Sequence, residues 1–161
     1  MSSLNPPKEP TAIAALTTLI WGRYDRVLRL RIGEAASARY GVRAFGPWLF
    51  WRDNIPEAEL EPIEPGSELP GGLIALYDGR GRNETPLWLP EQRALVFADA
   101  LTAPEGELRV WATPHEERAL PALRALLELP FELVIVAHGE PVHDRVAYER
   151  ALGLPTWGHG L

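Results

Sequence analysis

Residues 133–141, Leu-Val-Ile-Val-Ala-His-Gly-Glu-Pro, carry the strongest structural signal in the chain. The first four are apolar throughout, which is typical of a strand that is buried on both faces. This strand runs directly into a turn that contains histidine, glycine and proline. Open sheets carry functional groups at the carboxyl ends of buried strands, so His138 is a candidate site residue. A histidine that serves only the turn is the commoner case.

Helices are predicted on either side of this strand. Residues 114–129 have two glutamates in the first turn and four leucines along one stripe, and residues 142–152 form a second helix. Strands at 85–89 and 94–97 are joined by a hairpin turn at 90–93. The apolar residues 11–21 form either a strand or a short helix, and a strand at 14–20 is favoured. The other expected elements are a helix that Asp25 caps and that ends at Tyr40-Gly41, and strands at 42–45, 59–64, 73–77 and 108–111. This order of elements predicts a layered α/β (α+β) domain.

Length and charge limit the class of protein. The 161 residues suffice for one domain with a core, and we expect a flexible arm at 1–10, the domain at 11–152 and a tail at 153–161. No apolar run approaches the ~20 residues of a membrane span, and the first residues do not resemble a signal peptide. We therefore expect a cytoplasmic protein without membrane contact. The net charge of −6 argues against nucleic-acid binding.

Several kinds of chemistry are excluded by residue type. The chain has no cysteine, so disulfides, zinc ribbons and thiol nucleophiles are absent, and a metal would need histidine, aspartate or glutamate ligands. It has no glycine-rich phosphate loop, no Gly-x-Ser-x-Gly elbow and no His-Glu-x-x-His motif. His115 is expected to open the helix at 114–129. His143 and Asp144 share no helical face with His138, so we expect them on the solvated surface.

Four segments share their order and spacing with one known family. They are 64–73 (EPGSELPGGL), 79–85 (GRGRNET), 89–101 (LPEQRALVFADAL) and 134–142 (VIVAHGEPV). With them, the chain from residue 12 to residue 152 resembles the metallo-β-lactamase superfamily. Each segment alone is a weak signal, whereas the combination is specific. The resemblance implies a partial αββα sandwich, with a mixed sheet, flanking helices and metal ligands on loops at one edge.

The chain departs from the family pattern near its amino end. The family has several strands before its first metal motif, whereas at most about twenty residues precede the matching position here. An incomplete sandwich exposes a sheet edge and an apolar face, so we expect a homodimer that covers them. The aromatic residues Trp48, Phe50 and Trp51 are either core or an interaction surface, and the core is favoured.

The metal-ligand positions implied by the resemblance are mostly changed. The family holds its first metal with three histidines, and their positions are occupied here by Trp21, Arg23 and Arg80. Among the ligands of the second metal, the positions of Asp25, Asp99 and His138 are kept, while Arg26 replaces a histidine. A two-metal hydrolase is therefore not expected.

Three alternatives remain for the altered site. The first is a metal-free relic with a structural role, in which Arg23, Arg26 and Arg80 pair with the remaining carboxylates. In the second, the same arginines form a pocket for a small anion such as phosphate. In the third, Asp25, Asp99 and His138 hold one zinc, manganese or iron ion that activates water, although Arg26 would repel it. We favour a structural or anion-binding protein without hydrolase activity or cofactor.

Overall fold

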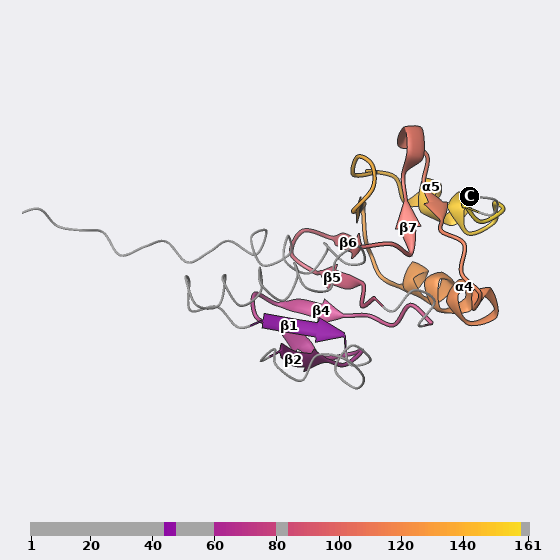
Figure 1. Ribbon diagram of the computed structural model, residues 1–161. Helices are drawn as coiled ribbons and strands as arrows, with labels where there is room; N and C mark the ends of the chain where they lie inside the picture. Colours follow the sequence, from indigo (N-terminus) through magenta and orange to yellow (C-terminus); the bar gives the residue numbers. More distant parts are fainter. Residues whose placement is uncertain (1–43, 48–59, 80–83, 159–161) are drawn as a thin grey trace, which may run out of the picture.

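A mixed five-stranded sheet forms the centre of the fold in the computed structural model, which describes residues 44–47, 60–79 and 84–158 (Figure 1). Its strands, in spatial order, are β3 (Glu68–Leu69), β4 (Leu73–Ala75), β5 (Leu87–Leu89), β6 (Ala94–Phe97) and β9 (Leu133–Val136). The first four strands pair in antiparallel fashion, and β9 pairs parallel to β6. The predicted α+β class, with a mixed sheet and flanking helices, is confirmed.

The central strands are buried on both faces because every residue in them is apolar. All positions of β5 and β6 are buried. Successive side chains of a strand point to opposite faces, so Leu95 and Phe97 enter one core cluster while Ala94 and Val96 enter another. The uninterrupted apolar run in β6 thus fits a sheet that is covered on two sides.

Helices cover the first face of the sheet. They are α4 (Glu116–Ala125), the short 3-10 helix η2 (Leu126–Glu128) and α5 (Arg145–Ala151). Tyr148 of α5 is completely buried, and its ring lies 6.2 Å from that of Phe97 and 5.0 Å from that of Phe131. Its hydroxyl donates to the carbonyl oxygen of Leu123 at 2.8 Å, which satisfies the buried polar atom. This one side chain therefore connects both helices to the sheet.

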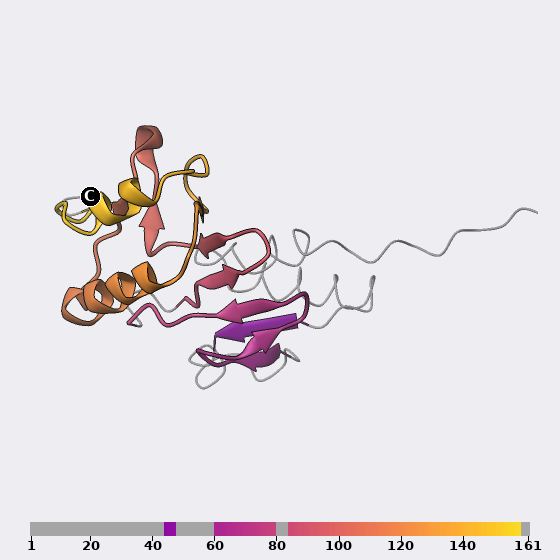
Figure 2. The same ribbon diagram turned by 180° about the vertical axis from the view of Figure 1, so that it is seen from behind.

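A parallel pair of strands contributes to the second face. β1 (Ala44–Pro47) and β2 (Leu60–Ile63) pair with each other, and Ile63 is buried in the second core cluster with Phe45 packed against it. Figure 2 shows this pair beside β4, on the far side from the helices. β2 contains Pro62, and a proline restricts a strand to a sheet edge; β2 accordingly has β1 as its one partner among the described strands.

A long crossover connects β6 to β9. After β6 the chain forms β7 (Leu101–Thr102), the 3-10 helix η1 (Pro104–Gly106), β8 (Arg109–Val110) and α4, and then returns as β9. β7 and β8 pair in antiparallel fashion. Because β6 and β9 are parallel, their carboxyl ends lie at the same edge of the sheet.

The predicted elements in the described ranges are present, several of them with shorter bounds, while the strand expected at 42–45 is described at Ala44–Pro47. The hairpin and the strand at 133–136 form as expected, whereas the helix expected at 114–129 divides into α4 and η2. The helix expected at 142–152 begins at Arg145, because the Asp144 carboxylate caps it by accepting from the Val146 N–H at 2.8 Å. Predictions at 14–20 and 25–40, and the aromatic residues Trp48, Phe50 and Trp51, lie outside the described residues. No helix within these ranges is long and apolar enough to cross a membrane.

Candidate functional site

Four elements bring acidic and histidine side chains to one edge of the sheet. Asp99 follows β6 and His138 follows β9, at the carboxyl ends of the parallel pair. Asp78 follows β4, which runs in the same direction as β6 because both are antiparallel to β5. Glu84 precedes β5 and therefore lies at this edge as well. We call the edge that these four residues occupy the site edge.

Asp99 and His138 are in direct contact. The Nε2 atom of His138 lies 3.3 Å from Oδ1 of Asp99, and the two side chains are 50% and 19% exposed. The carbonyl oxygen of His138 accepts from the Ala103 N–H at 2.8 Å and from the Thr102 hydroxyl at 3.0 Å. The end of β7 thus holds the backbone of His138 in place, while the imidazole of His138 is half-exposed and contacts Asp99.

Gly139 allows this close approach. It has a φ of +123°, and a Cβ atom at this position would lie 2.4 Å from the carbonyl oxygen of Ala103. A side chain would therefore overlap the very segment that donates to His138.

Glu84 holds the loop after β6. Its carboxylate accepts three backbone N–H bonds, from Ala98 at 3.2 Å, Asp99 at 2.5 Å and Ala100 at 2.8 Å. The pKa of Glu84 is raised from 4.5 to about 7, chiefly by burial; the nearby charge of Asp78 adds to this rise, and the three N–H donors partly offset it. Sequence reasoning missed this residue. The available signal was its place in the 79–85 segment, just before a buried strand.

Close packing at Gly79 determines the position of the backbone immediately after Asp78. Its φ is +74°, and a Cβ atom would lie 2.4 Å from the backbone oxygen of Arg118 in α4. Asp78 itself is 2% exposed. The chain therefore packs tightly against α4 immediately before Arg80, which lies outside the described residues together with Arg23, Asp25 and Arg26.

The described residues alone do not complete a metal site. They contain no group of three or more histidine, aspartate or glutamate side chains arranged to hold an ion. Asp99 and His138 are two suitable donors, whereas zinc, manganese and iron sites need at least three protein ligands. A metal at the site edge would thus require a ligand from outside the described ranges, such as Asp25.

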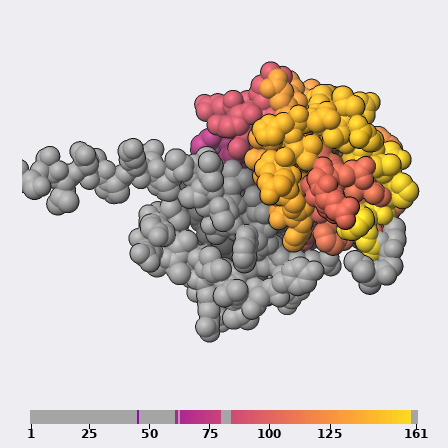
Figure 3. All heavy atoms as spheres, turned by 90° about the horizontal axis from the view of Figure 1, so that it is seen from above, coloured from indigo at the N-terminus to yellow at the C-terminus, as the bar shows by residue number. Residues whose placement is uncertain are grey.

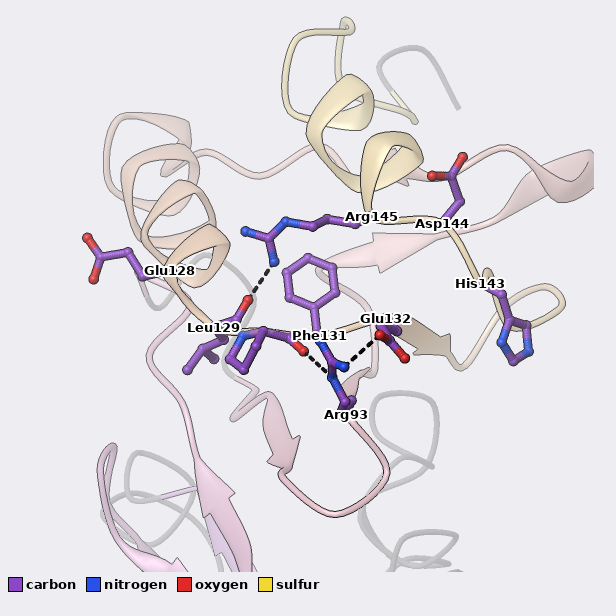
Figure 4. Close-up of a pocket in the computed structure, with 9 residues that line it drawn as sticks. Arg93, Glu128, Leu129, Phe131, Glu132, His143, Asp144 and Arg145 are labelled. Carbon is purple, nitrogen blue, oxygen red and sulfur yellow. Dashed lines mark hydrogen bonds and ion pairs between the residues drawn. The ribbon is translucent and has the colours of Figure 1, made fainter.

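A depression of about 810 Å³ lies at the other end of the same strands, before β6 and β9 (Figure 4). Arg145 stacks 4.7 Å above the ring of Phe131 and donates to two backbone carbonyls at the end of η2. Arg93 pairs with Glu132 at 2.7 Å. These arginines connect the turn of the hairpin, β9 and the helices, so we assign the depression a structural role. The exposed His143 lines it, as expected for a surface residue.

Comparison with known proteins identifies the fold. No protein-family model matches the chain, and no curated protein is similar to it. The metallo-β-lactamase TMB-1 aligns with a TM-score of 0.60 at 14% identity, over 81% of this chain and 62% of its own length. The DIM-1 metallo-β-lactamase exposed to ceftazidime gives 0.57 at 16% identity, over 82% and 63%. A metallo-β-lactamase from Pontibacter korlensis gives 0.56 at 16% identity, over 75% and 61%.

These likenesses agree with the resemblance found in the sequence. The chain spans about three-fifths of the length of each of the three structures. Their identities are low, so the likeness is one of fold, and function has to be argued from the site. The chain has the metallo-β-lactamase fold.

Proposed function

We propose that this protein binds a small anion at the site edge and does not act as a hydrolase. The observation that carries the proposal is the Asp99–His138 contact, which leaves a half-exposed imidazole at the carboxyl ends of β6 and β9. An imidazole N–H donates to an anion, and a protonated imidazole also attracts it electrostatically. Metal-ligand side chains at this edge are too few, among the described residues, to form a metal centre.

Arginine supplies the charge in this proposal. Arg80 comes two residues after Asp78 of the site edge, and Arg23 and Arg26 occupy positions that the resemblance assigns to metal ligands or their neighbours. A guanidinium stays charged at neutral pH and binds phosphate oxygens in pairs. In place of the metal ions that the resemblance implies, the arginines would offset the negative charge of the Asp78, Glu84 and Asp99 carboxylates. The guanidinium N–H groups that are not used in these ion pairs would donate to the bound anion.

Titration with inorganic phosphate tests this function. We expect phosphate to raise the melting temperature of the wild-type protein, since a ligand at 100 times its Kd adds about 2.7 kcal/mol to the stability of the folded state. His138→Ala and Arg80→Ala should lose most of this rise. His143→Ala removes an exposed histidine near the opposite ends of the strands and should keep it. An equal rise in all four proteins would be a general salt effect and would contradict the proposal.

A mononuclear metal-dependent hydrolase is the second candidate. The 3.3 Å between Asp99 Oδ1 and His138 Nε2 is also compatible with two donors that face one ion. In this case Asp25, Asp99 and His138 would hold zinc, manganese or iron, and the ion would supply an activated water.

Elemental analysis separates the two candidates. The protein is purified without chelator or metal-affinity resin, and the Asp99→Ala variant is prepared in parallel. We expect no stoichiometric metal in either sample. About one divalent ion per chain that disappears in Asp99→Ala would instead favour the hydrolase, and Asp144→Ala serves as the control for the loss of one exposed carboxylate.

A further inference from the structure

We propose that Trp111 and Trp157 form an aromatic wall beside His138, and that the anion bound there carries an aromatic ring which stacks on this wall. The inference rests on the proposed anion-binding function and names the ligand class of the same site. Three side chains carry the argument, Trp111, Trp157 and Arg109.

Trp111 lies directly against the candidate site. Its backbone N–H donates to the Ala100 carbonyl at 3.0 Å, one residue beyond Asp99. Its ring centroid lies 5.7 Å from that of His138, with a tilt of 57°. Because Val110 is buried in the core, the neighbouring positions of this strand point away from the core. The ring of Trp111 therefore lies against the imidazole of His138.

Trp157 extends the wall. It pairs with Trp111 through a parallel bridge, in which the Trp157 N–H donates to Val110 and its carbonyl accepts from Ala112, both at 2.7 Å. Paired residues of adjacent strands point to the same face. Figure 3 shows the segment of β8 side by side with the segment after β9 and with the C-terminal end of the described chain.

Arg109 fixes the orientation of Trp157. It lies two residues before Trp111 on β8, so both side chains share a face. Its guanidinium carbon lies 5.8 Å from the ring centroid of Trp157, and its Nη2 donates to the Pro155 carbonyl at 2.8 Å. The indole is thus held in one place by backbone and cation contacts before any ligand arrives.

This fixed indole remains accessible. Trp157 is 39% exposed and is one of three large apolar side chains, with Tyr77 and Val146, that the described residues leave exposed. An immobile exposed ring offers stacking area at little cost in conformational entropy. Its bridge partner Trp111 lies against the half-exposed His138, and this arrangement favours a ligand with an anionic group at His138 and an aromatic ring on the wall.

Inorganic phosphate and phenyl phosphate, compared by calorimetric titration, test the inference. We expect phenyl phosphate to bind the wild-type protein about tenfold more tightly than phosphate, since aromatic stacking is of that size. Trp157→Ala should remove this advantage and leave the affinity for phosphate unchanged. Trp157→Phe should retain it, and Val146→Ala, which shortens an exposed apolar side chain on α5, should behave as wild type.

The outcomes separate the inference from the proposed function. Equal affinities of the wild-type protein for the two ligands, or an advantage that survives in Trp157→Ala, would overturn the aromatic wall while the anion site stands. A parallel loss of both affinities in Trp157→Ala would also overturn it, because the residue would then act only on the fold. If neither ligand binds the wild-type protein, the anion-binding function itself fails. The wild-type comparison needs no variant, so a misfolded variant leaves the test intact.

Discussion

Glu84→Ala is expected to lower the free energy of unfolding by about 3 kcal/mol, because it leaves three backbone N–H groups without their acceptor. The Glu84 carboxylate accepts from residues 98–100 at 3.2, 2.5 and 2.8 Å. Alanine offers no acceptor there. Ala98 and Asp99 are only half-buried, so the loss is smaller than three separate penalties for fully buried donors. Denaturation with urea, followed by circular dichroism, measures the change.

Asp144→Ala is the matched control for this variant. Its carboxylate also accepts a backbone N–H, from Val146 at 2.8 Å, but it is exposed and serves one donor. The expected loss is about 1 kcal/mol. Glu84→Gln keeps one acceptor oxygen, so its loss of unfolding free energy should lie between the losses of Asp144→Ala and Glu84→Ala. A loss in Glu84→Ala no larger than that in Asp144→Ala would mean that other contacts hold the loop after β6.

The elements that the sequence predicted best are those whose signal is local. The apolar run at 94–97 is buried on both faces of the sheet and forms the inner strand β6. The apolar run at 133–136 also forms a strand, but β9 is the last strand of the described sheet, and Leu133 and Ile135 are only half-buried. The hairpin turn between β5 and β6 is likewise a matter of neighbouring residues. The two-residue strands β3 and β7 were missed, because two residues are too few to show a period.

Residues that act across long sequence distances were harder to predict. Glu84 meets its three partners 14 to 16 residues along the chain, and no pattern in the 79–85 segment shows that a carboxylate there accepts backbone bonds. Trp157 was assigned to a tail, yet it pairs with Trp111. In both cases the partner is set by tertiary packing, which a single sequence does not encode in a periodic form.

The candidate site was predicted in part. Asp99 and His138, named from the resemblance, meet at the site edge because β6 and β9 are parallel neighbours. The roles of Arg23, Asp25, Arg26 and Arg80 stay predictions, as do the homodimer and the cytoplasmic location. The altered ligand positions argue against a two-metal centre, and this too stays a prediction, because most of those positions lie outside the described residues.

Gly139→Ala is expected to cost about 3 kcal/mol of folding free energy and to weaken phosphate binding in the molecules that stay folded. A methyl group at this φ of +123° would lie 2.4 Å from the Ala103 carbonyl oxygen. Since the N–H of Ala103 is also the donor to the His138 carbonyl, relief of the overlap has to separate the end of β7 from His138. The imidazole would then move away from Asp99.

Gly66→Ala is the control that separates the effect of steric overlap at Gly139 from the effect of a positive φ. Gly66 also has a positive φ, of +89°, but nothing lies within 4 Å of a Cβ atom there, so only the conformational cost of about 1 kcal/mol applies. The two variants are compared by urea denaturation and by phosphate titration at a temperature where both are folded. Gly66→Ala should bind phosphate as the wild-type protein does. If Gly139→Ala does so too, either the position of His138 does not depend on its contact with β7, or the histidine is not the group through which the site edge holds its ligand; His138→Ala distinguishes the two.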